Sequence, residues 1–387
     1  MQTVLSAPSG RLLSLDAFRG LTVASMILVN NAGDWDHIYP PFEHADWHGW
    51  TPTDLIFPFF LFIVGVSITY ALGGEKERSA LAEGKKAGVS GKIVRRGLTL
   101  FALGLFLNFF PKFDPTLVRI PGVLQRIGLV YIVCSFIYLR YTEQQQRWWI
   151  VGLLIGYWLL ITVVPVPGIG YANLDPTTNL SAWLDNLVLT PAHVYKATKV
   201  WDPEGILSTI PAIATGLLGV LTGTWLRSAK PTPEKIAWLF AAGVLVALSG
   251  YVADAFFPIN KKIWTSSYVL LAGGLAMIGL ATCYWLIDVI GIDRPAYRRW
   301  SLPFVAYGVN AITVFFLSGL IPRIMNLIKV QMPAGTEVGL QAYLYQSFIA
   351  PLFANPYNAS LAGALTCVLI WAVILWIMYR KNIIIKV

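Results

Sequence analysis

Two of the four histidines in the chain lie close to carboxylates, in the stretch EHADWHGWTPTD from Glu43 to Asp54. Imidazole has an ordinary pKa of about 6.5, so it can accept a proton near neutral pH and can also act as an acyl-accepting nucleophile. A nearby carboxylate can orient the ring and stabilise its cationic form. His44, with Asp46 or Asp54 as its partner, is therefore a candidate for acid–base or acyl-transfer chemistry.

Two simpler interpretations of this stretch stay open at the level of sequence. The histidines can be solvated loop residues, with Asp54 capping the start of a helix. His44 and His48 also have the HxxxH spacing of a metal-binding pair. No third ligand is indicated, however, and Pro52 places the helix start after both histidines, so we expect no metal ion here.

The composition is that of a membrane protein. Of the 387 residues, 56% are hydrophobic and 13% are charged, and the mean hydropathy is +0.62. A soluble domain carries about twice that share of charge. Apolar blocks of about twenty residues, the length needed to cross a bilayer as a helix, recur along the chain. They lack the alternation of β-barrel strands. We predict an all-α polytopic bundle of about ten transmembrane helices, at 12–33, 52–73, 92–110, 118–140, 147–166, 204–227, 234–257, 262–288, 300–328 and 359–380.

No polar interval between these blocks suggests a separate soluble domain. Residues 1–387 are therefore predicted to form a single transmembrane domain. The segment 340–354 is apolar but too short to span comfortably, and Pro351 would interrupt a helix there. We predict a re-entrant or interfacial piece at this point.

Lysine and arginine are unevenly shared between alternate connections, and this bias predicts orientation. The connection 74–96 alone contains seven of them. Both termini are therefore predicted to be cytoplasmic, and the stretch Glu43–Asp54 extracytoplasmic. The same bias accounts for the net charge of +9. Contact with anionic membrane lipid suffices to explain it, so no nucleic-acid partner is expected. In a bacterium the expected location is the inner membrane.

Several motifs, in order, resemble one family of membrane enzymes. SLDAFRGLTVASMILVN (14–30) and HADWHGWTPTDLIFPFFLFIVG (44–65) resemble the start of the membrane domain of the heparan-α-glucosaminide N-acetyltransferase family. Four later stretches resemble further motifs of that family in the same order: RIPGVLQRIGLVY (119–131), DPEGILSTI (202–210), NKKIWTSSYV (260–269) and GVNAI (308–312). The resemblance covers nearly the whole chain. It implies an acetyl-CoA-dependent N-acetyltransferase that passes acetyl from the cytosol to a glucosamine-type amino sugar across the membrane, and it implies a homodimer.

The resemblance also implies roles for residues near the opening stretch. His44 corresponds to the catalytic histidine of the family. Asp54, which ends the same motif, is expected to take part in catalysis with it. Asn30 corresponds to an asparagine at the end of the first helix, and Asn31 is an adjacent alternative. Trp47, in the same motif as His44, is expected to contact the acceptor sugar.

Three later motifs supply the expected binding residues. Arg119 and Arg126 lie seven residues apart and so on one helical face, and arginine's fork of donors suits phosphate or amide groups. We expect acetyl-CoA to contact Arg119, Gln125, Arg126, Asn260, Lys261, Trp264 and Ser267. The alternative for the NKKIWTSSYV motif is that its lysines and tryptophan anchor the chain at the membrane interface. Asp202 and Glu204 are expected to bind the acceptor sugar, although an acidic residue before a helix is also ordinary capping.

Two mechanisms and a second function stay open. His44 either carries the acetyl group transiently or acts as general base while both substrates are bound. In both cases Asn30 could stabilise the developing oxyanion. The alternative function is a secondary transporter for an amino sugar, with Asp16, Arg19 and His44 as proton or substrate sites.

Overall fold

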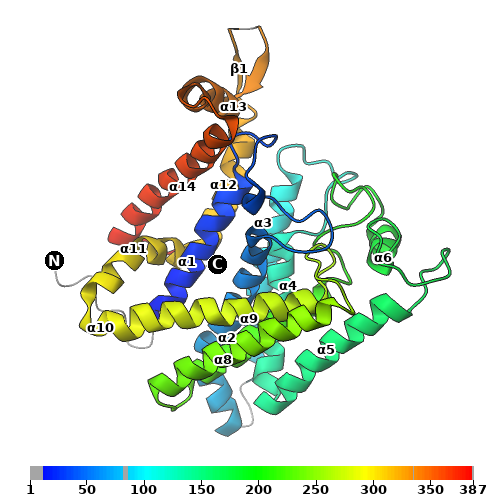
Figure 1. Ribbon diagram of the computed structural model, residues 1–387, viewed down its shortest axis with the longest axis vertical. Helices are drawn as coiled ribbons and strands as arrows, with labels where there is room; N and C mark the ends of the chain where they lie inside the picture. The colour runs from blue at the N-terminus through cyan, green and yellow to red at the C-terminus, as the bar shows by residue number, and fades with distance from the viewer. Residues whose placement is uncertain (1–11, 82–85, 334, 386–387) are drawn as a thin grey trace. The chain divides into compact units, whose positions relative to one another are not determined.

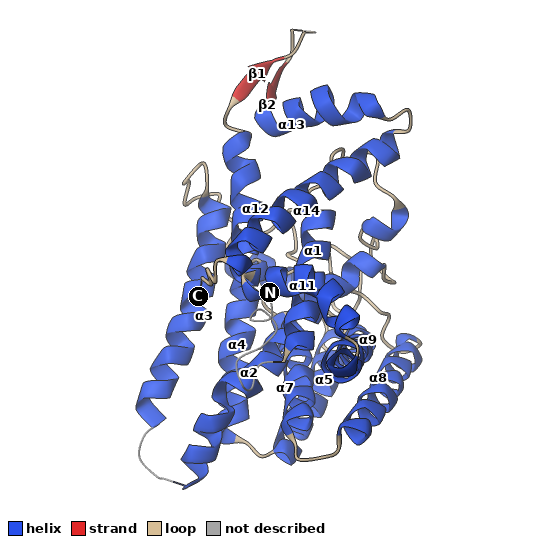
Figure 2. Ribbon diagram, turned by 90° about the vertical axis from the view of Figure 1, so that its left-hand side faces the viewer, coloured by secondary structure: helices blue, strands red, loops and turns tan. Residues whose placement is uncertain are grey.

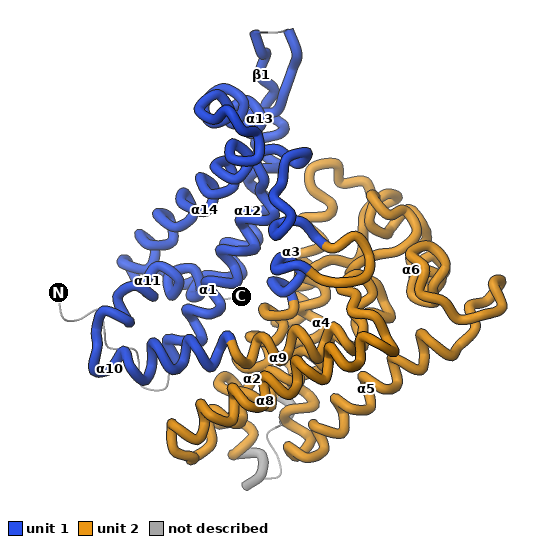
Figure 3. The backbone as a smooth tube through the Cα atoms, viewed as in Figure 1, with its two compact units in different colours: residues 1–44, 51–57, 279–386 blue, residues 45–50, 58–278, 387 orange. Residues whose placement is uncertain are grey.

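The computed structural model describes residues 12–81, 86–333 and 335–385. Almost all of its regular structure is helical, which confirms the predicted all-α architecture (Figures 1 and 2). The chain divides into two compact units (Figure 3). Residues 1–44, 51–57 and 279–386 form unit 1, and residues 45–50 and 58–278 form unit 2. The stretch Glu43–Asp54 therefore contributes residues to both.

Unit 1 is organised around α1 (Leu13–Asn30), which crosses α11 (Pro295–Val309) and also contacts α12 (Ala311–Met325) and α14 (Pro356–Arg380). Glycines permit the crossing with α11. A Cβ added at Gly20 would collide with the Phe304 carbonyl, and one added at Gly308 would collide with the Asp16 carbonyl. Small residues that let helix backbones approach are the usual device in membrane bundles.

The chain bends by 69° between α11 and α12, at Asn310. The Asn310 amide donates to the carbonyl of Ile383 (3.0 Å) and accepts from the N–H of Ile385 (2.9 Å). Arg19 Nη1 donates to the Gly308 carbonyl (3.2 Å) and to Asp16 Oδ1 (2.9 Å). Side chains thus pair with backbone groups at the bend, as a break in a membrane helix requires. Arg19 acts here as a support for the bend.

The remaining elements of unit 1 are short. A π-helical turn, η3 (Tyr284–Ile290), leads into α10 (Gly291–Asp293), and two 3₁₀ turns, η1 (Pro40–Phe42) and η2 (Pro52–Leu55), flank the histidine stretch. After α12 comes an antiparallel hairpin of β1 (Lys329–Gln331) and β2 (Glu337–Gly339) (Figure 2). Then follow α13 (Leu340–Leu344), η4 (Tyr345–Ile349) and η5 (Ala350–Leu352). The segment 340–354 is therefore a series of short helical turns and not a span.

Unit 2 contains eight helices among the described residues. They are α2 (Ile56–Leu81), α3 (Lys86–Phe109), α4 (Val123–Arg140), α5 (Glu143–Val163), α6 (Leu180–Leu189), α7 (Thr209–Arg227), α8 (Thr232–Asp254) and α9 (Ser266–Cys283), with the first residues of α2 and the last of α9 in unit 1. Helix α3 packs on α4, and α7 contacts both α4 and α5. Apart from Trp47, the predicted binding residues lie in the loops before α4, α7 and α9 and in the first turns of α4 and α9.

The predicted number of spans needs correction. Within the described residues, eight helices are long and apolar enough to cross a membrane, and the bent pair α11–α12 would make nine. All ten predicted blocks are helical. Helix α3 is too polar to count as a spanning helix, because every 18-residue stretch of it contains the three charged residues Lys92, Arg95 and Arg96. The chain is a multi-pass integral membrane protein. The first eleven and the last two residues, which are predicted to be cytoplasmic from the charge bias of the connections, lie outside the described residues.

Candidate functional site

His44 and Asp54 form a hydrogen-bonded pair in unit 1. Nδ1–H of His44 donates to Asp54 Oδ1 at 2.7 Å. The Asp54 side chain is 1% exposed, whereas that of His44 is 45% exposed. A buried carboxylate thus orients an accessible imidazole, and places the ring proton on Nδ1 and the lone pair on Nε2. The structure selects Asp54 over Asp46, which lies in unit 2, as the partner in this pair.

Hydrogen bonds hold the backbone on both sides of this pair. The N–H of Thr51 donates to Asp54 Oδ2 at 3.0 Å, so the same carboxylate also caps η2. Thr51 Oγ1 donates to the Glu43 carbonyl (2.6 Å), and Thr53 Oγ1 donates to the Pro41 carbonyl (3.1 Å). The capping interpretation of Asp54 and its pairing with the histidine are therefore both correct, because the two oxygens are used separately.

The two adjacent asparagines at the end of α1 differ in environment. Asn31 is buried, and its Nδ2 donates to the Ile27 carbonyl at 2.9 Å, which closes the last helical turn. Asn30 is exposed. Helix α1 also contacts η2, which carries Asp54. The structure thus leaves the amide of Asn30 accessible and uses that of Asn31 as a helix cap.

The segment 45–50 is held within unit 2. Trp47 Nε1 donates to the Leu174 carbonyl at 2.8 Å, and its ring meets that of Trp201 edge to face at 5.2 Å. The N–H of Gly49 donates to the Ile259 carbonyl at 2.7 Å. Gly49 has φ +93°, a conformation that favours glycine. Trp47 and Gly49 of the histidine motif therefore anchor the segment beside the NKKIW loop.

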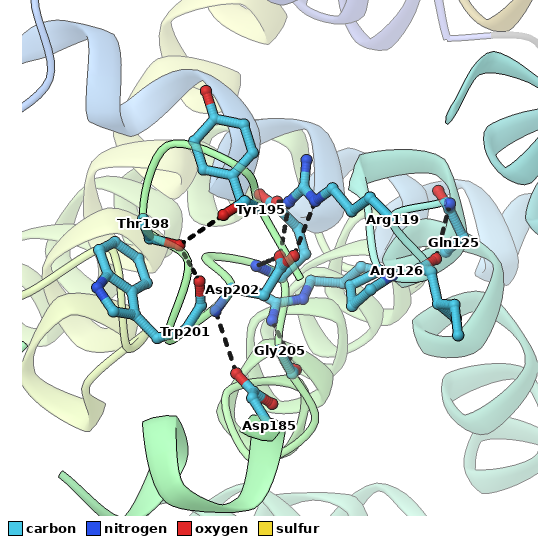
Figure 4. A network of polar contacts seen from close by, with 12 residues as sticks. Arg119, Gln125, Arg126, Asp185, Tyr195, Thr198, Trp201, Asp202 and Gly205 are labelled. Atoms are coloured by element: carbon cyan, nitrogen blue, oxygen red, sulfur yellow. Dashed lines mark hydrogen bonds and ion pairs between the residues drawn. The ribbon is translucent and has the colours of Figure 1, made fainter. Parts of the chain in front are cut away.

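A buried ion-pair network lies on the loops before α4 and α7 (Figure 4). Arg119 donates from Nε to Asp202 Oδ2 (2.8 Å) and from Nη2 to Asp202 Oδ1 (2.6 Å), a bidentate pair. Nη2 also donates to Glu204. The guanidinium lies over the Tyr195 ring at 4.7 Å. The structure therefore brings Arg119 to Asp202 and Glu204, two residues that lie more than eighty positions later in the sequence.

The charge states of this network follow from its pairing. Burial opposes ionisation of Arg119, but the hydrogen bond to Asp202 and the charges of Glu204 and Asp202 outweigh it and raise the pKa of the guanidinium. Burial opposes ionisation of Glu204 too, but Arg119, Arg126 and Lys261 together lower its pKa. Arg119 and Glu204 are thus both charged at neutral pH.

Arg126 lies in the first turn of α4, next to this network. It is 1% exposed, and its Nη2 donates to the Gly205 carbonyl at 3.1 Å and to Ser208 Oγ. Its guanidinium lies 5.1 Å from the centre of the Trp264 ring. Among the described residues, Nε and Nη1 of Arg126 have no hydrogen-bond acceptor. Buried donors of this kind need a partner.

The NKKIW loop forms a tight buried turn. Asn260 Oδ1 accepts from the N–H groups of Lys262 (2.7 Å) and Ile263 (3.1 Å). Trp264, at φ +55°, is fully buried and donates from Nε1 to Thr215 Oγ1 at 3.2 Å. Ser267 is buried beside Thr265, at 3.0 Å between their hydroxyl oxygens. Asn260 Nδ2 is a second buried donor without an acceptor in the described part of the chain.

The side chain of Gln125 stabilises the loop that precedes α4. Its Nε2 donates to the Ile120 carbonyl at 3.0 Å, and its side chain fills the space beside Gly104 and Gly122. Its amide thus supports the turn that carries Arg119. The remaining predicted binding residue, Lys261, is half-buried in the NKKIW loop.

Asp185 on α6 belongs to the network, although the sequence analysis did not identify it. Its two carboxylate oxygens accept from the N–H of Asp202 (3.2 Å) and of Ile206 (2.9 Å), so it holds the loop that carries Asp202 and Glu204 (Figure 4). The signal available in the sequence was a single acidic residue within the apolar stretch LSAWLDNLVL. Burial raises the pKa of Asp185 to about 6, partly offset by these hydrogen bonds.

This raised pKa predicts a specific dependence of stability on pH. Between about pH 4 and pH 6 the folded protein keeps a proton on Asp185 that the unfolded chain has lost, so the contribution of Asp185 to stability falls as pH rises. We expect the melting temperature of wild type, relative to that of Asp185→Asn, to decrease across this window and to level off above about pH 7. Thermal scans of both proteins in one detergent would measure it. A constant difference would contradict the assignment.

Comparison with known proteins identifies the family of this chain. The family model for the catalytic region of heparan-alpha-glucosaminide N-acetyltransferase matches residues 11–249. The human protein of that name is 29% identical over 437 aligned residues, which cover 99% of this chain and 61% of the human protein. The mouse protein is 28% identical over 433 residues, with 98% and 61% covered. The chain thus spans about 61% of the length of these curated relatives. Since the family model covers more than half of its residues, the chain belongs to the heparan-alpha-glucosaminide N-acetyltransferase family.

Proposed function

We propose that this protein transfers an acetyl group from cytosolic acetyl-CoA to the amino group of a glucosamine-type sugar on the extracytoplasmic side, with His44 as the reacting residue. The observation that carries the proposal is the pairing of accessible His44 with buried Asp54 in a chain of this family. The proposal includes cytoplasmic termini, a homodimer and, in a bacterium, the inner membrane.

The pair supports the chemistry of acyl transfer. With the proton of His44 on Nδ1, Nε2 is the nitrogen that reacts. In one route Nε2 attacks the thioester carbon, the C–S bond breaks and CoA leaves as its thiolate. The acetyl group then passes from Nε2 to the amine, which releases a proton to water. In the other route Nε2 removes that proton while the amine attacks the thioester directly, and the C–S bond breaks with CoA again leaving as its thiolate. In both routes Asp54 stabilises the cationic ring.

The buried donors of unit 2 fit a ligand with many acceptor oxygens. Acetyl-CoA carries phosphate and amide oxygens. Such oxygens can accept from Nε and Nη1 of Arg126 and from Nδ2 of Asn260, which have no acceptor among the described residues. We assign coenzyme binding to these two residues together with Arg119, Gln125, Lys261, Trp264 and Ser267. Trp47, Asp202 and Glu204 are assigned to the acceptor sugar.

Sealed proteoliposomes test the proposal directly. With radiolabelled acetyl-CoA on the side of the basic loops and glucosamine on the other, we expect labelled N-acetylglucosamine to form across the membrane. The bend between α11 and α12 is a feature of transporters, whose broken helices bind substrate near the bilayer midplane. Uptake of glucosamine without any acetylated product would therefore assign the protein to the transporter class.

The environments of Asn30 and Asn31 predict opposite effects of replacing them. We expect Asn30→Ala to lower kcat by about a hundredfold or more, because an oxyanion donor is lost, with little change in melting temperature. Asn31→Ala should lower the melting temperature, because the Ile27 carbonyl at the end of α1 loses its donor. Acetyl-transfer rates and thermal scans of both variants would separate these outcomes. The reverse pattern would make Asn31 the functional residue.

A further inference from the structure

Unit 1 contains a cavity of about 430 Å³ that none of the proposed catalytic roles uses. Its walls come from the segment just after α1, the end of α12, the turns α13 and η4, and the middle of α14. Figures 1 and 2 both show α12, α13 and α14 grouped together. A cavity of this size can hold a substantial part of a small ligand.

The lining excludes charged ligands. None of the nineteen residues that line the cavity is Lys, Arg, His, Asp or Glu. Phosphate, sulfate and carboxylate groups are bound by cationic side chains or by several converging donors. The cavity is therefore unsuited to the phosphates of acetyl-CoA, and equally to a sulfated or uronic-acid-containing sugar. Its occupant is uncharged in the part that lies inside.

Most of the lining is apolar, with a few uncharged polar groups. Ile321, Ile370 and Ile374 represent the apolar part, and Asn31, Asn326 and Gln341 contribute amides. Since Nδ2 of Asn31 donates to the Ile27 carbonyl, its carbonyl oxygen is the group it offers to a ligand. Amides of this kind bind hydroxyl groups. The cavity thus combines an apolar chamber with hydroxyl-binding groups.

The apolar wall continues onto the surface that faces lipid. Only 17% of the apolar stretch of α14 is buried, and Ile370 and Ile374 are both exposed. Leu369 and Val373, also exposed, neighbour them on the same helix. In a membrane this surface is covered by hydrocarbon, so a hydrocarbon chain can enter the cavity from the bilayer without crossing water.

We propose that this cavity binds the hydrocarbon chain of an amphiphile, and that the acceptor is an amino sugar linked to such a chain. The second part rests on the proposed acetyltransferase function. The polypeptide connects the cavity to the proposed reacting residues, because the lining residues Asn31, Ala32, Gly33 and Trp35 follow Asn30 in sequence and the same loop continues to His44. The protein would then act on a membrane-anchored sugar in preference to a free one.

A series of n-alkyl glucosaminides tests this proposal, with the full chain in nanodiscs and each compound below its micelle concentration. We expect KM to fall as the alkyl chain lengthens, by at most about fourfold for each fully buried methylene. We expect kcat to differ by no more than about twofold along the series, because the reacting groups are the same in every compound. Partitioning into the nanodisc lipid lowers KM as well. It does so equally for every variant of the protein.

Two variants isolate the contribution of the cavity. Ala342 lines it, and Ala342→Phe should fill it and reduce the dependence of KM on chain length. Leu369 is exposed on α14 outside the cavity, so Leu369→Phe should retain the wild-type dependence. Equal chain-length dependence in wild type and Ala342→Phe, with both active, would overturn the proposal.

If no sugar is acetylated, the proposed function is refuted. A second measurement then still tests whether the cavity binds a hydrocarbon chain. Cys367 lines the cavity, whereas Cys283 is partly buried elsewhere in unit 1. We expect octyl β-D-glucoside to slow alkylation of Cys367 by N-ethylmaleimide several-fold, with Cys283 as the internal reference in peptide mass spectrometry. An unchanged ratio of the two rates would show that the cavity does not take the chain.

Discussion

Replacing His44 by alanine is expected to lower the rate of acetyl transfer by about 10²- to 10⁴-fold, the usual contribution of a positioned proton-transfer residue. The side chain is 45% exposed, so its removal leaves no large cavity and the melting temperature should change little. Free imidazole should restore part of the activity of His44→Ala, because it can supply the missing nitrogen. Initial rates with and without imidazole, together with a thermal scan, measure all three effects.

His48→Ala is the matched control. His48 is exposed in the same stretch, four residues further along the chain, and has no assigned part in the reaction. We expect it to retain wild-type activity. If His44→Ala were as active as His48→Ala, His44 would be a solvated loop residue, and the proposed chemistry would lose its reacting group.

We also expect Asp54→Asn, at the carboxylate partner of His44, to lower the rate of acetyl transfer. An amide at this position either turns its oxygen toward His44 and its NH₂ toward the Thr51 N–H, or the reverse, so one of the two bonds is lost. If the bond to His44 is lost, the ring proton is no longer fixed on Nδ1. In that orientation we expect a loss in kcat on the order of 10²- to 10⁴-fold, and no response to imidazole, since a ring is still present.

The sequence predicted the helices and the pairing of His44 with a carboxylate because both depend on local patterns. Long apolar stretches specify membrane helices whatever their neighbours. The His44–Asp54 pair joins residues ten apart across one short turn. The sequence left open which carboxylate was the partner, because that choice depends on how η2 places the side chain of Asp54.

What the sequence did not predict depends on three-dimensional packing. The bend at Asn310 lies inside a continuous apolar block, and its stabilisation comes from Arg19 and from the segment around Ile383, both distant in sequence. Asp185 acts on the Asp202 loop, seventeen residues away, through backbone N–H groups that carry no sequence signal. The cavity of unit 1 arises from four separate segments, none of which has an unusual composition.

The largest expected effect on stability comes from Arg119. Arg119→Met removes the guanidinium and leaves Asp202 (0% exposed) and Glu204 (8% exposed) without their main partner. Uncompensated buried charge typically costs about 3–5 kcal/mol. We expect the melting temperature to fall by roughly 5–10 °C. Acetyl transfer should fall too, because the loop that carries both carboxylates is held by this arginine.

The chain supplies a matched control, because Arg147 pairs with Glu143 at 2.5 Å where the two side chains are 58% and 47% exposed. Exposed pairs contribute about 0–1 kcal/mol, so Arg147→Met should change the melting temperature by no more than about 2 °C. Adding Asp202→Asn and Glu204→Gln to Arg119→Met should recover part of the lost stability, because the penalty lies in the unpaired charges and not in the missing arginine. A wild-type melting temperature for Arg119→Met alone, or no recovery in the triple variant, would show that the network contributes no more than a surface pair.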